Sequence, residues 1–271
     1  MSERADSPKS KILVFDSGVG GLSILQAIGG RLPQFEYVYA SDNAGFPYGT
    51  KSEVELVERT DKVLRALIRL ENPDIVVIAC NTASTVALPK IRSHFTKPVV
   101  GVVPAIKPAA AKSTSKVIGL LATPGTVNRA YTHQLISDFA SHCEVISVGS
   151  SEMVELAEQK LRGHHIDRDK IAAIVRPFFD HPELDTIVLA CTHFPLLQNE
   201  LLEVASRKVD WIDSGEAIAR RVASLLGLES SSPVQAGHSF EAILTSERDI
   251  DNLRAGLISF GATRLKFLQC L

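Results

Sequence analysis

The sequence predicts an α/β protein made of two similar three-layer domains, each with a mainly parallel sheet. Short apolar runs rich in β-branched residues alternate with longer segments of helical periodicity. This alternation runs along the chain twice, and repeated strand–helix–strand units favour parallel sheets with helices on both faces. The length of 271 residues suits one large domain or two smaller ones.

The first half of the chain contains four predicted strands separated by helical segments. The run KILVF ends at Asp16 and a glycine-rich turn, after which a helix is predicted from about Leu22. The segment 52–70 has apolar residues at helical spacing and starts at Ser52, a residue type that caps helices. The run DIVVIA has few polar positions, as expected of a parallel strand buried on both faces. The predicted strands are 11–15, 35–40, 74–79 and 98–103.

The same alternation restarts near Lys116 and continues to the end of the chain. The polar segment 228–237 is predicted to be a surface loop. The predicted strands are 116–122, 143–149, 186–190, 209–213 and 239–246. The segment 123–140 is predicted to be a loop that leads into a helix. Further helices are predicted over 151–162, 168–179, 195–206 and 215–227, and from about Glu247.

The two halves read as a pseudo-repeat with small insertions. Cys80 and Cys191 are 111 residues apart, and the strand starts near Lys11 and Lys116 are 105 residues apart. We predict a first domain formed by residues 1–104 together with 214–271, and a second formed by residues 105–213. The cleft between them is the predicted active site.

The composition excludes several classes of protein. Hydrophobic residues make up 45% of the chain, charged residues 22%, and the net charge is −2, which is an ordinary globular balance without the basic excess of a nucleic-acid binder. The first residues lack the apolar core of a secretion signal, and no apolar run approaches the ~20 residues that span a bilayer. We therefore expect a cytoplasmic protein without nucleic-acid or membrane partners.

Four cysteines are present: Cys80, Cys143, Cys191 and Cys270. In a cytosolic chain of this length we expect reduced thiols, and the absence of a C-x-x-C pair weakens both structural zinc and disulfide exchange. Zinc could take Cys80, Cys191 and His193, but no further ligand is evident, so we expect no metal. A lone buried cysteine usually behaves as a small hydrophobe, which is our interpretation of Cys143 and Cys270.

Cys80 and Cys191 differ because each ends a predicted strand, in IACNTAS and LACTHFP, before a predicted helix. A helix N-terminus lowers the pKa of a thiol, and the thiolate is the reactive form. Two such thiols in matching halves indicate a pair that acts from opposite sides. Inversion at carbon needs this pair, since one group removes a proton from one face while the other donates a proton to the opposite face.

The turn DSGVGG follows the first predicted strand. It matches neither the dinucleotide fingerprint G-x-G-x-x-G nor a P-loop. Two interpretations stay open here: a tight strand-to-helix turn, or a nest of backbone N–H groups that holds a carboxylate.

Seven motifs in series resemble those of the glutamate racemase family across nearly the whole chain: VFDSGVGGLSIL, SDNAGFPYGTKS, VVIACNTAST, GVVPAIKPA, LLATPGTV, LACTHFPLL and IDSGEAIA. The resemblance implies a cofactor-independent enzyme that interconverts L- and D-glutamate, with D-glutamate entering peptidoglycan. It implies that Cys80 and Cys191 are the acid/base pair, with Cys80 acting on the D-enantiomer and Cys191 on the L-enantiomer.

The resemblance also implies which residues surround the thiols. Asp16 and His193 are the candidates that assist Cys80 and Cys191. Glu155 matches a further family acid, although Glu152 stands where the family usually has proline. The residues expected to hold the substrate are Asp16, Ser17, Tyr48, Gly49, Asn81, Thr82, Thr192, His193 and Glu155.

Two alternatives and two additions stay open from the sequence. A racemase for another acidic amino acid such as aspartate is the closest rival, because one methylene is worth only ~1–3 kcal/mol in a pocket; by resemblance, His193 in the CTH triplet favours glutamate. A non-catalytic binding protein, for instance one that inhibits a DNA-handling enzyme, is the rival from another class. Resemblance also suggests activation by a UDP-muramyl-alanine and a homodimer.

Overall fold

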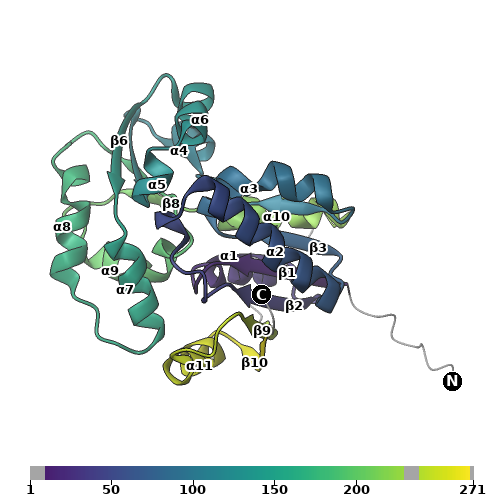
Figure 1. Ribbon diagram of the computed structural model, residues 1–271. Helices are drawn as coiled ribbons and strands as arrows, with labels where there is room; N and C mark the ends of the chain where they lie inside the picture. The colour runs from purple at the N-terminus through teal and green to yellow at the C-terminus, as the bar shows by residue number, and fades with distance from the viewer. Residues whose placement is uncertain (1–9, 229–237, 269–271) are drawn as a thin grey trace, which may run out of the picture.

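The structure, a computed structural model, describes residues 10–228 and 238–268. It consists of two α/β domains with parallel sheets, which confirms the predicted fold class (Figure 1). The strands are β1 (Lys11–Asp16), β2 (Glu36–Ser41), β3 (Ile75–Ile78), β4 (Val99–Gly101), β5 (Val117–Ala122), β6 (Glu144–Gly149), β7 (Thr186–Leu189), β8 (Asp210–Ile212), β9 (Phe240–Leu244) and β10 (Ala262–Phe267). The helices are α1 (Leu22–Arg31), η1 (Tyr48–Thr50), α2 (Glu53–Glu71), α3 (Asn81–His94), α4 (Ile106–Lys112), α5 (Pro124–Val127), α6 (Ala130–Ala140), α7 (Glu152–Leu161), α8 (Arg168–Phe179), η2 (Phe194–Leu197), α9 (Gln198–Val204), α10 (Gly215–Leu225) and α11 (Ile250–Ser259).

The two sheets share one strand order, which confirms the pseudo-repeat. The larger sheet runs β10-β9-β2-β1-β3-β4 and the smaller runs β6-β5-β7-β8, with every pair parallel. Four strands of each sheet therefore follow the order second, first, third, fourth. In this correspondence β3 matches β7, so Cys80 and Cys191 follow equivalent strands.

Each sheet is buried between two helical layers. In the larger sheet α1 and α10 pack on one face, and α2 and α3 pack on the other. In the smaller sheet α7, α8 and α9 cover one face, and α4 and α6 cover the other. Every residue of β3 and β7 is buried, as their nearly unbroken apolar runs predict.

The structure departs from the sequence prediction mainly near helix ends and at the end of the chain. The predicted helix 195–206 is broken into η2 and α9, and α11 begins at Ile250 rather than near Glu247, because Asp249 has a left-handed φ of 53°. Strand β10 was not predicted; its alternation of Arg264 and Lys266 with apolar residues is that of an edge strand. Cys270 and most of the predicted loop 228–237 lie outside the described residues.

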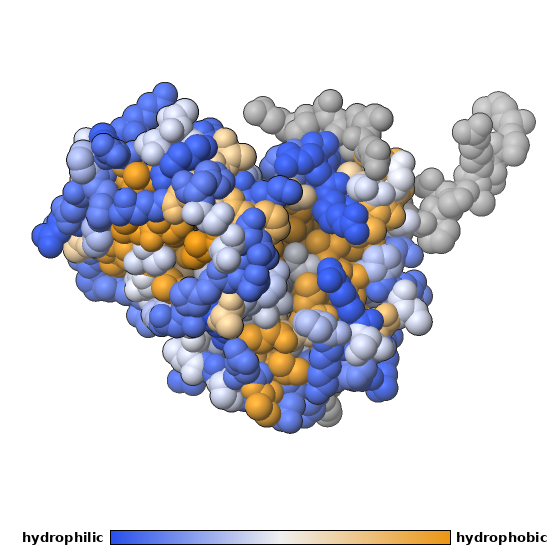
Figure 2. Space-filling model, turned by 90° about the horizontal axis from the view of Figure 1, so that it is seen from above, coloured by the Kyte–Doolittle hydropathy of each residue, from blue (hydrophilic) through white to orange (hydrophobic). Residues whose placement is uncertain are grey.

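None of the helices in residues 10–228 and 238–268 is long and apolar enough to cross a bilayer. On the face seen in Figure 2, hydrophilic residues alternate with separate hydrophobic patches.

Helix α11 packs against α7 of the smaller-sheet domain through Gly256. A Cβ atom on Gly256 would meet the carbonyl oxygen of Leu161 at 2.1 Å, and that atom belongs to the backbone. We expect Gly256→Ala to lower the free energy of unfolding by about 2 kcal/mol, since overpacking at a rigid contact forces the helices apart. Urea denaturation measures this. Asn252→Ala, on the exposed side of the same helix, is the control, and an equal loss in both variants would contradict the packing argument.

Candidate active site

A cavity of about 590 Å³, including its open mouth, lies at the carboxyl ends of the strands, between the two domains. This is where open parallel sheets bind ligands. Every site residue predicted from the sequence lines it except Asp16, which lies directly behind Ser17. The lining residues of the first half are Ser17, Phe46, Pro47, Tyr48, Gly49, Thr50, Cys80, Asn81 and Thr82; those of the second are Thr123, Ser151, Val154, Glu155, Cys191, Thr192 and His193.

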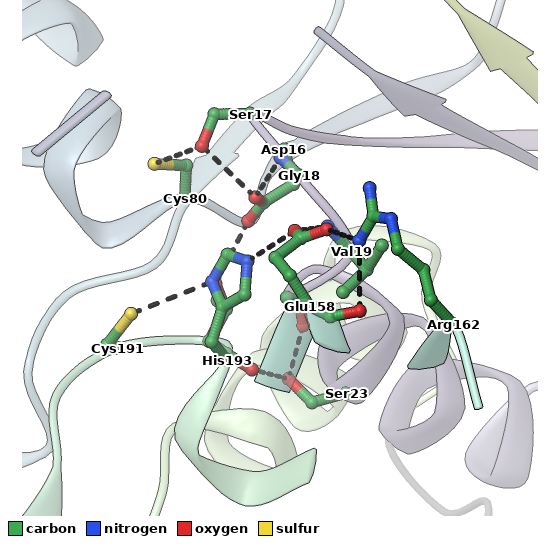
Figure 3. A network of polar contacts seen from close by, with 12 residues as sticks. Asp16, Ser17, Gly18, Val19, Ser23, Cys80, Glu158, Arg162, Cys191 and His193 are labelled. Carbon is green, nitrogen blue, oxygen red and sulfur yellow. Dashed lines mark hydrogen bonds and ion pairs between the residues drawn. The ribbon is translucent and has the colours of Figure 1, made fainter. Parts of the chain in front are cut away.

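A buried chain of polar contacts runs from Cys191 through His193 to Glu158 (Figure 3). Nδ1 of His193 is 3.8 Å from the Cys191 sulfur, and Nε2 is 2.9 Å from Oε1 of Glu158. Burial would lower the pKa of His193, but the contacts with Cys191 and Glu158 outweigh it and raise that pKa well above its ordinary value. Burial likewise opposes ionisation of Glu158, yet His193 and Arg162 lower the pKa of this carboxyl to about 2.

These contacts fix the proton positions on the imidazole. The ionised carboxylate of Glu158 is an acceptor only, so Nε2 of His193 carries a proton and donates it. Nδ1 is left to face the sulfur of Cys191. It accepts from the thiol when the ring is neutral and donates to the thiolate when the ring is charged. His193 is thus placed to exchange a proton with Cys191 or to stabilise its thiolate.

Glu158 was missed by the sequence prediction, which named Glu155 as the acid of this segment. Glu155 lies on the cavity wall and is exposed, whereas Glu158, one turn further along α7, is buried and contacts His193. Both residues follow an apolar position in the same helix. Only the direction of the helix toward the glycine-rich turn decides which carboxylate reaches the imidazole.

The surroundings of Cys80 are different. Its sulfur caps α3 by accepting a hydrogen bond from the backbone N–H of Ala83 at 3.5 Å, and it lies 3.8 Å from the hydroxyl of Ser17. Burial, together with the negative charge of Asp16, nevertheless raises the pKa of Cys80. The sequence predicted a lowered thiol pKa from the helix N-terminus; that prediction is wrong for Cys80, because burial outweighs the helix.

Cys191 also departs from the prediction. The turn after β7 leads into the short helix η2, which begins at Phe194, so Cys191 does not cap an α-helix. Its polar partner is the side chain of His193.

The glycine-rich turn binds carboxylates of the protein itself. The N–H of Gly18 donates to Oδ1 of Asp16 at 2.9 Å, and the N–H of Val19 donates to Oε1 of Glu158 at 2.8 Å. Oδ2 of Asp16 accepts from the Thr192 hydroxyl at 3.0 Å, which ties the two domains together beneath the cavity. Burial raises the pKa of Asp16, against the opposing charge of His193. Both interpretations of this turn hold in part, since the bond between Gly18 and Asp16 closes a tight strand-to-helix turn and the N–H of Val19 binds a carboxylate of the protein itself.

Comparison with known proteins decides the family. A family model described as Asp/Glu/Hydantoin racemase matches residues 22–222. Glutamate racemases of Escherichia coli (strain S88) and Shigella flexneri are each 48% identical over 265 residues, covering 97% of this chain and 93% of the relative.

This chain belongs to the Asp/Glu/hydantoin racemase family.

Solved structures agree with that membership. The crystal structure of Escherichia coli glutamate racemase, in complex with L-glutamate and the activator UDP-MurNAc-Ala, superposes with a TM-score of 0.90 at 48% identity. The match covers 97% of this chain and 100% of that chain. Glutamate racemase from Aquifex pyrophilus superposes with a TM-score of 0.72 at 30% identity, covering 96% and 98% of the two chains.

For a racemase of this family, two further features of the cavity matter. The Tyr48 hydroxyl donates to Asp42 at 2.6 Å, and Arg59 and Thr245 bind the same buried carboxylate, so Tyr48 is anchored below the cavity and offers mainly its backbone to a ligand. Among the described residues, Oδ1 of Asn81 is a buried acceptor without a hydrogen-bond partner. No group of three or more metal-ligating side chains occurs in the described part of the chain.

Proposed function

We propose that this protein is a cofactor-independent glutamate racemase that works by a two-base mechanism with Cys80 and Cys191. The observation that carries the proposal is the pair of thiols: they follow equivalent strands of two sheets with one topology and line one cavity, each with a polar partner of its own. Family membership and the glutamate racemases among its relatives support the choice of reaction.

In this mechanism one thiolate removes the Cα proton of glutamate and the opposite thiol donates a proton to the other face. The Cα–H bond breaks as the S–H bond forms on one side, and the reverse happens on the other. We propose that Cys80 accepts the proton of D-glutamate and Cys191 that of L-glutamate. His193 assists Cys191 directly, whereas Asp16 acts near Cys80 through Ser17, which lies between them.

The polar wall of the cavity supports binding of an amino acid. We propose that the unpaired Oδ1 of Asn81 accepts a hydrogen bond from the substrate ammonium. The hydroxyls of Ser17 and Thr82, and the backbone at Tyr48 and Gly49, are placed to bind carboxylates. The Thr192 hydroxyl gives its proton to Asp16, so it is placed to accept a hydrogen bond from the substrate ammonium. Donors to the α-carboxylate also stabilise the enolate-like charge that develops when the proton leaves. Glu155, on the wall, is the remaining candidate contact.

We propose that the product D-glutamate serves peptidoglycan synthesis and that the enzyme acts in the cytoplasm. A UDP-muramyl-alanine is the proposed activator, because the Escherichia coli relative at 48% identity is described in complex with UDP-MurNAc-Ala. Initial rates measured with and without UDP-MurNAc-Ala test this regulation, and rates that do not respond reject it.

The function is tested with purified protein, L-glutamate and no added cofactor, by following optical activity to zero. In D₂O we expect deuterium at Cα of the newly formed D-glutamate, as the donating thiol exchanges with solvent. Parallel reactions with aspartate set the specificity: exchange of aspartate without exchange of glutamate overturns the assignment to glutamate. Absence of exchange with either amino acid favours a non-catalytic binding protein.

A further inference from the structure

Arg129 links the two domains beside the cavity. It precedes α6 in the second half of the chain, yet its guanidinium contacts two helices of the first half. Nη1 donates to the Thr85 hydroxyl of α3 at 3.4 Å, and Nε is 3.8 Å from Oε1 of Glu53 at the start of α2. Only 9% of the Arg129 side chain is exposed, against 70% for Glu53, so this cation is held inside the interface rather than on its rim.

The guanidinium lies just behind the cavity wall on the Cys80 side. Thr85, its partner, donates in turn to the carbonyl oxygen of Thr82 in the first turn of α3, the helix that Cys80 caps. On the other side, a Cβ atom on Gly125 would lie 3.8 Å from Nη2 of Arg129 and 2.9 Å from the carbonyl oxygen of Gly49. Thr82 and Gly49 both line the cavity. Arg129 is therefore joined to the wall through Thr85 and Thr82, and its guanidinium lies close to Gly125, which in turn approaches the backbone of Gly49.

The groups around Cys80 carry mostly negative charge or none. No lysine or arginine lines the cavity in the described part of the chain. The titratable groups with the clearest electrostatic coupling to the Cys80 thiolate include Asp16, Cys191, Tyr39, Tyr48 and Arg129. Arg129 alone in this set is a cation, and the other four are neutral or negative. Glutamate adds two carboxylates and one ammonium. His193 is the cation that lines the cavity on the Cys191 side, whereas no lysine or arginine of the described residues lines it on the Cys80 side.

We propose that Arg129 is a positioning residue that clasps the second domain onto α3 and supplies the positive charge that favours the thiolate of Cys80 and the dicarboxylate substrate. An arginine suits this role because its guanidinium keeps its charge when buried and binds in several directions at once. Burial lowers the pKa of Arg129, against the opposing effects of Glu53 and Cys80, but an arginine starts high enough to stay charged at neutral pH. The inference rests on the proposed function for its substrate, but its effect on the thiol is independent of racemisation.

The experiment measures the rate of Cys80 alkylation by iodoacetamide, a neutral reagent, at fixed pH. Digestion with trypsin separates Cys80 (peptide 70–90) from Cys191 (peptide 171–207), and mass spectrometry follows each peptide. The variants are Arg129→Gln, Arg129→Lys and, as a matched surface control from the same half of the chain, Arg168→Gln, whose side chain is 62% exposed.

At pH 8 we expect Arg129→Gln to slow alkylation of Cys80 about tenfold, the change in thiolate fraction for one unit of pKa. Arg129→Lys keeps the charge and should restore most of the rate, and Arg168→Gln should match the wild type. A purely structural role predicts the reverse, since a loosened interface exposes both thiols and speeds alkylation of both. An unchanged or faster rate at Cys80 in Arg129→Gln overturns the proposal.

Kinetics with glutamate separate this proposal from the proposed function. If the wild-type protein racemises glutamate, Arg129→Gln should raise KM several-fold, with partial recovery in Arg129→Lys. If the wild type does not racemise glutamate, the function fails while the alkylation result still decides the role of Arg129. If the wild type racemises glutamate and the rate of Cys80 alkylation is unchanged in Arg129→Gln, the role proposed for Arg129 is wrong and the proposed function is unaffected.

Discussion

Replacing Cys80 or Cys191 singly by serine should lower kcat/KM for glutamate about a thousandfold. A serine hydroxyl has a far higher pKa than a thiol, so it supplies no base at neutral pH, and general acid–base groups typically contribute two to four orders of magnitude. The loss of kcat/KM should be similar for the two substitutions, because each turnover uses one cysteine as acid and the other as base. Chiral chromatography of the products, starting from either enantiomer, measures the loss.

The equilibrium constant adds an internal check to this prediction. Two enantiomers have the same free energy in water, so kcat/KM must be equal in the two directions for every active variant. Cys143→Ser is the control, because Cys143 is a partly exposed free thiol outside the cavity. Full activity in either of the two cavity variants would rule out the two-base mechanism.

Residual proton exchange tells the two thiols apart. In D₂O, Cys191→Ser retains Cys80 and should exchange the α-proton of D-glutamate only. Cys80→Ser should exchange that of L-glutamate only. The opposite pattern would reverse the roles proposed for the two cysteines without affecting the mechanism.

The fold was predictable because its information is local and repeated. The apolar runs of β3 and β7 indicate strands buried on both faces, and the repeat places their ends in equivalent positions. The end of the chain was harder to predict: β10 is an edge strand with arginine and lysine in alternation, and only its pairing with β9 makes it a strand.

The site was predicted less completely, since its electrostatics depend on burial and on contacts between the domains. The helix N-terminus at Cys80 is readable from the sequence, but the burial that raises the pKa of its thiol is not. Glu158 and Glu155 are equally acidic in the sequence, and only the packing of α7 against the glycine-rich turn selects Glu158. Arg129 likewise reads as one more surface cation until the second domain is placed against α3.

Glu158→Gln should lower kcat/KM at pH 7 by about 10- to 100-fold, by analogy with the loss of the carboxylate that orients a metal-bound imidazole. The substitution is close to isosteric, and the amide oxygen still accepts from His193 and Val19. The negative charge is lost, and with it much of what raises the pKa of His193. The imidazolium then loses its proton at a lower pH, so it supports the Cys191 thiolate over a narrower range.

The pH dependence of this variant has a defined sign. A histidine with a raised pKa stays charged to higher pH, so the alkaline limb of the kcat/KM profile should move to lower pH in Glu158→Gln. The same pair affects the stability of the fold. Glu158 has a depressed pKa, so its contribution is complete above the ordinary value of 4.5 and is lost as the pH falls toward about 2. The contribution of His193 is complete below its ordinary value of 6.5 and is lost as the pH rises through its raised value.

The pair should therefore stabilise the protein most between about pH 4.5 and 6.5, and the difference in unfolding free energy between wild type and Glu158→Gln should be largest there. Urea denaturation at pH 3, 5.5 and 9 measures it. Glu155→Gln, one turn away on the cavity wall, is the comparison. Because Glu155 is exposed, this variant should keep the unfolding free energy and the alkaline limb of the wild type. If Glu155→Gln shifts the profile and Glu158→Gln does not, the carboxylate that sets the charge of His193 is the one on the cavity wall, and the buried contact only packs the helix.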